Sequence, residues 1–193
     1  MTDEEQTSST SVPAPADDGG GRHLAGMALP DIALPATSGV DVNLSRLGSI
    51  RTVVFAYPRT RIPGVPFPEA FEAIPGAIGC TPQALGFRDL AEDFAALGVR
   101  ILGLSTNTAA YQREMIERLG IGYPVLSDEG LRLTRALRLP TFDVDGTTYL
   151  KRLTMIIRDG VIESVLYPVF PADQSAEATY QHVCEMIRRE HAS

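Results

Sequence analysis

Short apolar runs alternate with stretches of helical periodicity along the chain from Met27 onward. The runs at residues 52–57 and 99–104 are bounded by Gly or Pro and predict buried strands. Between them, apolar residues at helical spacing predict a helix that begins at Thr81-Pro82 and stops at Gly98. This alternation of strands and helices predicts an α/β fold.

Further elements continue the same alternation. Three helices are expected: over about residues 109–119, directly after Ser127-Asp128, and over about residues 175–189. Residues 153–158 and 161–167 are predicted to form a hairpin through Asp159-Gly160, because a type I′ turn needs positive φ at both central positions.

The first 24 residues differ in composition from the rest. They are rich in Ser, Thr, Pro, Gly and acidic residues and nearly devoid of apolar ones, so we expect a flexible acidic tail over residues 1–24 and one domain over residues 25–193. Five acidic residues and one arginine give this tail −4 of the net charge of −7. Since the remainder has no basic cluster, neither nucleic acid nor an anionic membrane is expected as a partner.

The chain has only two cysteines, Cys80 and Cys184, and no CxxC pair. They cannot build a disulfide framework or a four-thiolate zinc site, and we expect neither a metal nor another cofactor. No signal peptide is recognisable, and no apolar stretch approaches the roughly 18 residues that span a bilayer. These features predict a reducing cytoplasmic location.

Cys80 is the candidate nucleophile. It directly precedes the predicted start of a helix, where the helix dipole and free N–H groups favour a thiolate. The alternative is a buried, inert cysteine. The neighbouring Gly76, Gly79, Thr81 and Pro82 form a turn rather than an apolar face, which favours the nucleophile.

The segment GCTPQALGFRD around Cys80 resembles the peroxidatic-cysteine segment of peroxiredoxins, in particular of the peroxiredoxin Q (bacterioferritin-comigratory-protein) branch. Four other stretches agree in order: Leu29-Pro30-Asp31 with Leu44-Ser45, residues 99–105, residues 123–128, and residues 152–157. The resemblance covers about residues 25–190. It implies a thioredoxin-like fold, a central mixed sheet flanked by helices, with an N-terminal hairpin.

The resemblance also implies a thiol-dependent peroxidase for hydrogen peroxide or organic hydroperoxides. Cys80 would attack the peroxide and become a sulfenic acid, with Arg152 as its cationic partner. A solvated charge at a strand end is the alternative for Arg152. The implied partners are the peroxide and an external thiol reductant: thioredoxin, glutaredoxin or a small thiol.

The chain departs from the family signature PxxxTxxC. Pro58 and Cys80 are 22 positions apart instead of seven, so residues 59–79 contain an insertion, and Ala77 stands where the family has Thr. We expect Pro58 with Thr60 or Thr81 to contact the peroxide, although helix capping is an alternative for Thr81. The inserted loop is interpreted as a lid over Cys80 or as a decoration.

Leu85 occupies the position of the usual resolving cysteine of this branch, five residues after Cys80. Cys184 is a candidate resolving cysteine, but its place beside Tyr180 and Ile187 also suits a core residue. The prediction is therefore a one-cysteine enzyme, monomeric or homodimeric. The alternative is a redoxin-fold protein that has lost peroxidase activity and serves in binding or in a specialised biosynthetic step.

Overall fold

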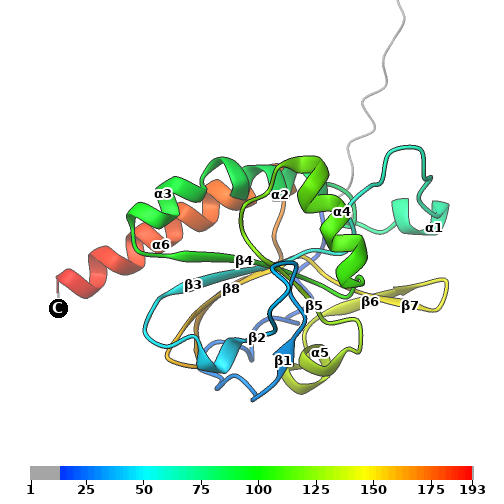
Figure 1. Ribbon diagram of the computed structural model, residues 1–193. Coiled ribbons are helices and arrows are strands. Elements are labelled where there is room, and N and C mark those ends of the chain that lie inside the picture. The colour runs from blue at the N-terminus through cyan, green and yellow to red at the C-terminus, as the bar shows by residue number, and fades with distance from the viewer. Residues whose placement is uncertain (1–13, 193) are drawn as a thin grey trace, which may run out of the picture.

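A five-stranded mixed sheet lies at the centre of the computed structural model, which describes residues 14–192 (Figure 1). The strands, in spatial order, are β5 (Val125–Ser127), β4 (Arg100–Ser105), β3 (Thr52–Ala56), β8 (Leu153–Arg158) and β9 (Val161–Leu166). The first three run parallel, whereas β8 is antiparallel to both β3 and β9. The predicted α/β architecture with a central mixed sheet is confirmed.

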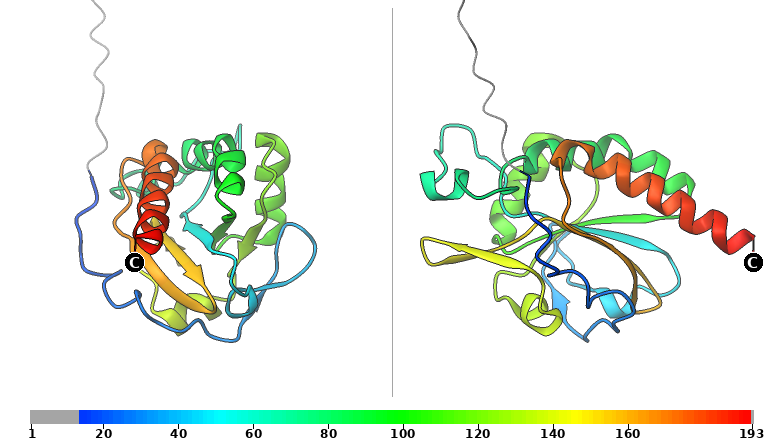
Figure 2. Two further views of the ribbon diagram at one scale, coloured as in Figure 1. Left: turned by 90° about the vertical axis from the view of Figure 1, so that its left-hand side faces the viewer. Right: turned by 180° about the vertical axis from the view of Figure 1, so that it is seen from behind.

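Helices cover both faces of this sheet unequally (Figures 1 and 2). One face carries α2 (Cys80–Asp89), α3 (Ala91–Ala96), α4 (Ala109–Leu119) and α6 (Ser175–His191). The other carries α5 (Arg132–Leu137), the 3-10 helix η1 (Leu44–Arg46) and the N-terminal hairpin of β1 (Ala33–Leu34) and β2 (Val42–Asn43). A separate apolar core fills each side, because both faces of the central strands are buried.

Turn and helix-end residues in the sequence correctly marked the ends of several helices and strands. Asp159 and Gly160 have φ of 50° and 72°, as a type I′ turn requires, and they join β8 to β9. Gly120 ends α4 with a φ of 62°. The single helix expected after Thr81-Pro82 is instead two helices, α2 and α3, which meet at Leu90, and α2 begins one residue earlier, at Cys80.

A second hairpin was not predicted. It consists of β6 (Thr141–Val144) and β7 (Thr147–Leu150), joined by Asp145-Gly146 with φ of 51° and 75°. At the same end of the molecule lies the short helix α1 (Glu69–Glu72) of the inserted loop (Figures 1 and 2). Phe71 of this helix is fully buried against Phe142 and Tyr149 of the hairpin, so the insertion is packed onto the domain.

The predicted flexible tail is wrong for residues 17–24. Leu24 is fully buried in the core, and a Cβ on Gly21 would lie 2.8 Å from the Tyr167 side chain, so the backbone sits directly on that ring. Asp18 binds the ammonium of Lys151 at 2.6 Å. Residues 1–13 of the predicted tail lie outside the described residues. Within residues 14–192, every helix is too short or too polar to cross a bilayer.

Candidate active site

Cys80 is the first residue of α2 and is 3% exposed. Gly79 precedes it with a φ of 105°, a left-handed conformation that favours glycine. A Cβ on Gly79 would also lie only 2.7 Å from the Cβ of Ala172, at the start of the 3-10 helix η2 (Ala172–Gln174). Two independent constraints thus hold Cys80 at the helix N-terminus, where the dipole stabilises negative charge.

The structure brings Arg152 to Cys80. The guanidinium donates to Cys80 Sγ at 3.4 Å and to the carbonyl oxygens of Gly76 and Ile78 at 3.3 and 3.2 Å. Arg152 is only 4% exposed, and among residues 14–192 no carboxylate lies within ion-pair distance of it. A buried cation is costly without a counter-charge, so the Arg152 guanidinium is available to stabilise negative charge that develops beside Cys80.

Gln83 completes this arrangement and was not singled out from the sequence. It is fully buried, accepts a hydrogen bond from Arg152 through Oε1, and donates from Nε2 to Ser175 Oγ at 3.1 Å. The available signal was a polar residue one helical turn after Cys80, on the same buried side of the helix. Its two bonds connect α2 to Arg152 and to the first residue of α6.

Tyr57, the last residue before Pro58, is buried close to Cys80. Burial raises the pKa of Tyr57 well above the ordinary tyrosine value, and negative charge on Cys80 adds to this shift. The Tyr57 hydroxyl is therefore neutral and able to donate a hydrogen bond.

A pocket of about 550 Å³ opens at Cys80. Thr81 lines it, and Gly79 rather than Thr81 caps the helix, so the capping role considered for Thr81 is wrong. Thr60 and Pro58 are buried and are not part of the pocket wall. The backbone carbonyl of Thr60 accepts a hydrogen bond from the Tyr111 hydroxyl at 2.5 Å. The side-chain hydroxyl of Thr60 has no partner among the described residues.

The inserted loop does contribute to this pocket, through Arg59, Arg61 and Phe67. Arg118 of α4 adds a third guanidinium to the wall. These arginines were not predicted as site residues, because their proximity depends on how the loop folds over α4. The only signal was a pair of arginines within three residues of the family's proline position.

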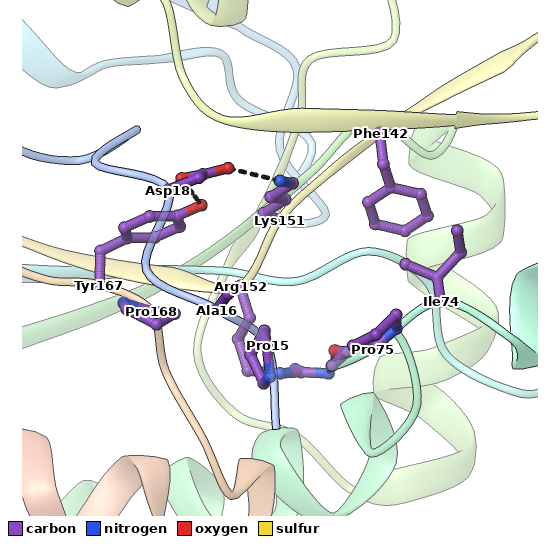
Figure 3. Close-up of a pocket in the computed structure, with 11 residues that line it drawn as sticks. Pro15, Ala16, Asp18, Ile74, Pro75, Phe142, Lys151, Arg152, Tyr167 and Pro168 are labelled. Carbon is purple, nitrogen blue, oxygen red and sulfur yellow. Dashed lines mark hydrogen bonds and ion pairs between the residues drawn. The ribbon is translucent and has the colours of Figure 1, made fainter. Parts of the chain in front are cut away.

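A second cavity, of about 330 Å³, lies beside Arg152 (Figure 3). Its walls include Arg152 and Phe142, whereas Cys80 does not line it. Figure 3 shows Lys151 and Tyr167 directed at Asp18, whose carboxylate accepts from both, at 2.6 and 2.7 Å. The N-terminal segment thereby forms part of the wall on this side of Arg152.

Cys184 is not brought to Cys80. It lies on α6, nine residues after Ser175, and a helix rises about 14 Å over that length. Ser175 is the residue of α6 that contacts the site, through Gln83. Cys184 is half-buried rather than part of the packed core that we considered, and both cysteines are free.

The Redoxin family model matches residues 24–182, and the chain belongs to this family. Peroxiredoxin Q, a chloroplast protein of Oryza sativa subsp. japonica, is 28% identical over 145 residues, which are 75% of this chain and 59% of the relative. The corresponding Arabidopsis thaliana protein is 25% identical and is covered over 64% of its length. The chain thus spans about three fifths of these curated relatives.

Among solved structures, peroxidoxin BcpB from Mycobacterium tuberculosis has a TM-score of 0.66 and 28% identity, covering 82% of this chain and 96% of that one. The expected thioredoxin-like fold and the recognition of the peroxiredoxin Q branch are confirmed.

Proposed function

We propose that this protein is a thiol-dependent peroxidase in which Cys80 is the nucleophile. The observation that carries this proposal is the 3.4 Å contact between Cys80 Sγ and Arg152, a buried guanidinium with no carboxylate partner among the described residues. The peroxiredoxin Q relatives support the same chemistry.

In the proposed reaction the Cys80 thiolate attacks the terminal oxygen of a hydroperoxide, ROOH. The S–O bond forms as the O–O bond breaks, so sulfur loses two electrons and Cys80 becomes a sulfenic acid. The leaving RO⁻ takes a proton from water and departs as an alcohol, or as water when the substrate is hydrogen peroxide.

The surrounding groups suit this step. Arg152 and the N-terminus of α2 stabilise the thiolate, and the guanidinium also faces the charge that develops on the leaving oxygen. Thr81 lines the pocket beside Cys80, and we assign to its hydroxyl the hydrogen bond to the peroxide. Pro58 and Thr60 lie outside the pocket wall, which weighs against the same role for them.

Reduction of the sulfenic acid is proposed to use an external thiol. One thiol displaces water to give a mixed disulfide with Cys80, and a second thiol releases Cys80 and leaves as a disulfide. The position of Cys184 far along α6 supports this one-cysteine cycle. The choice among thioredoxin, glutaredoxin and a small thiol, the cytoplasmic location, and the oligomeric state stay predictions.

A redoxin-fold binding protein without peroxidase activity is the second candidate. It is favoured by one observation: Ala77 is buried in an apolar cluster where the family places a hydroxyl. Peroxide consumption by the reduced protein, compared with Cys80→Ser, decides between the two. We expect stoichiometric consumption by the wild type and none by the variant; equal, background consumption by both proteins supports the binding protein.

A further inference from the structure

The pocket at Cys80 is much larger than hydrogen peroxide requires. Its volume of about 550 Å³ lies within the range of organic ligand sites, whereas a water-sized molecule occupies only about 30 Å³. Phe67, Ile78 and Pro63 give it apolar walls, which suit the carbon skeleton of an organic substrate.

The charged part of the wall is cationic. Three arginines line the pocket, and no carboxylate of residues 14–192 does. Arg61 and Arg118 have carboxylate partners nearby, Glu72 and Glu114, each at 2.6 Å. Their charges are therefore largely compensated within the protein.

Arg59 differs from the other two arginines. Its hydrogen-bond partners are the neutral hydroxyls of Tyr111 and Tyr149, at 3.1 and 3.3 Å, and no carboxylate among residues 14–192 pairs with it. The guanidinium also lies over the rings of Phe67 and Tyr111, 5.7 and 5.1 Å from their centroids. These contacts fix its position and leave Nη2 without a partner among the described residues.

From this arrangement we propose that Arg59 binds the anionic group, a carboxylate, of an organic hydroperoxide whose peroxide end reaches Cys80. This inference rests on the proposed peroxidase function and adds a substrate class to it. A planar guanidinium with free donors matches a carboxylate, and the uncompensated charge attracts one. Arg59 and Cys80 line the same pocket. Cys80 is a free thiol held against Arg152, which is the form that reacts with peroxide.

The test compares two peroxides that differ by one carboxylate group: cumene hydroperoxide and its para-carboxylate derivative. For each, the second-order rate constant of Cys80 oxidation is measured by quenched-flow mass spectrometry. We expect the wild type to prefer the carboxylate derivative by roughly tenfold or more, as a charge-assisted hydrogen bond implies. Arg59→Met, which keeps a long apolar chain against Phe67, should bring this ratio close to one.

Two further variants make the comparison specific. Arg59→Lys retains the positive charge and should keep part of the preference. Arg113→Met removes the same charge from an exposed position of α4 outside the pocket wall, and its ratio should equal that of the wild type. A fall in the ratio with Arg113→Met as large as with Arg59→Met would attribute the effect to overall charge and overturn the proposal.

The reduction step serves as a control, because an anionic thiol reductant could bind Arg59 in place of the peroxide. Reduction of the Cys80 sulfenic acid is measured with 3-mercaptopropionate, which is anionic, and with neutral 2-mercaptoethanol. Discrimination by Arg59 in this step alone would assign the subsite to the reductant and overturn the peroxide assignment. Equal rates for both peroxides in an active wild type overturn the inference and leave the peroxidase intact. Failure to reduce either peroxide overturns both.

Discussion

Gln83 accepts a hydrogen bond from the guanidinium of Arg152, although the two residues are 69 positions apart in the chain. The same helix carries Cys80, so this bond sets the cation and the sulfur in a fixed relation to each other. Because Gln83 is neutral, it orients the guanidinium without competing for its charge. A carboxylate in its place would offer Arg152 a second anion beside Cys80.

We therefore predict that Gln83→Met lowers the alkylation rate of Cys80 by iodoacetamide about three- to tenfold at neutral pH, since loss of one net hydrogen bond corresponds to roughly 1 kcal/mol. Gln83→Glu should lower it further, because the new carboxylate pairs with Arg152. Gln181→Met, at an exposed position of α6, is the matched control and should react like the wild type. An unchanged rate in both Gln83 variants contradicts the positioning role.

The second prediction concerns Gly79. Gly79→Ala should destabilise the fold by more than the roughly 1–2 kcal/mol of a left-handed backbone, because the new Cβ also meets Ala172. Gly98→Ala is the control, since Gly98 has a φ of 68° with open space around its Cβ position. The free energy of unfolding of both variants is measured with denaturant. Equal losses in the two variants would show that the contact with Ala172 adds no further destabilisation.

The third prediction concerns the N-terminal segment. Hydrogen bonds from Lys151 and Tyr167 hold the pKa of Asp18 well below the ordinary carboxyl value. The stabilising contribution of ionised Asp18 is thus fully present above about pH 4 and is lost as the pH falls through the lowered pKa.

Asp18→Asn should therefore speed tryptic cleavage after Arg22 at neutral pH. Asp41→Asn, an exposed acid elsewhere on the surface, is the control and should leave this cleavage unchanged. The advantage of the wild type over Asp18→Asn in unfolding free energy should shrink toward low pH. A difference in unfolding free energy that stays constant from pH 7 to pH 2 would contradict a stabilising ion pair between Asp18 and Lys151.

Short-range features of the fold were predictable because their causes are local. Gly120 and Asp159-Gly160 adopt the positive φ that their sequence context indicated. Asp145-Gly146 carried the same signal for the β6–β7 hairpin, which was not predicted. The ordered segment at residues 17–24 was mispredicted from composition, because a single Leu24 and close glycine contacts anchor it.

The two principal members of the candidate site could be proposed from the sequence. Cys80 and Arg152 stand out through a helix start and a family resemblance. By contrast, Gln83 and Arg59 are positioned by hydrogen bonds to partners far away in the chain, Arg152 and Tyr149, which no local pattern reveals.

The fourth prediction addresses the fate of oxidised Cys80. One equivalent of peroxide should yield mainly a sulfenic acid that dimedone traps, because Cys184 lies about 14 Å along α6 from the end that contacts the site. Cys184→Ser should still turn over with an external dithiol. Intact mass spectrometry that shows quantitative loss of two hydrogens, as a Cys80–Cys184 disulfide, would overturn the one-cysteine cycle.

The central claim is that Arg152 activates Cys80 toward peroxide. Its most direct test is the second-order rate constant of sulfenic acid formation at Cys80 in Arg152→Met, measured by quenched flow beside the wild type. Unfolding curves of both proteins verify that the variant is folded. We expect the rate constant to fall by roughly 100-fold or more, the size expected when a donor to developing charge is removed. A folded Arg152→Met that reacts as fast as the wild type would contradict it.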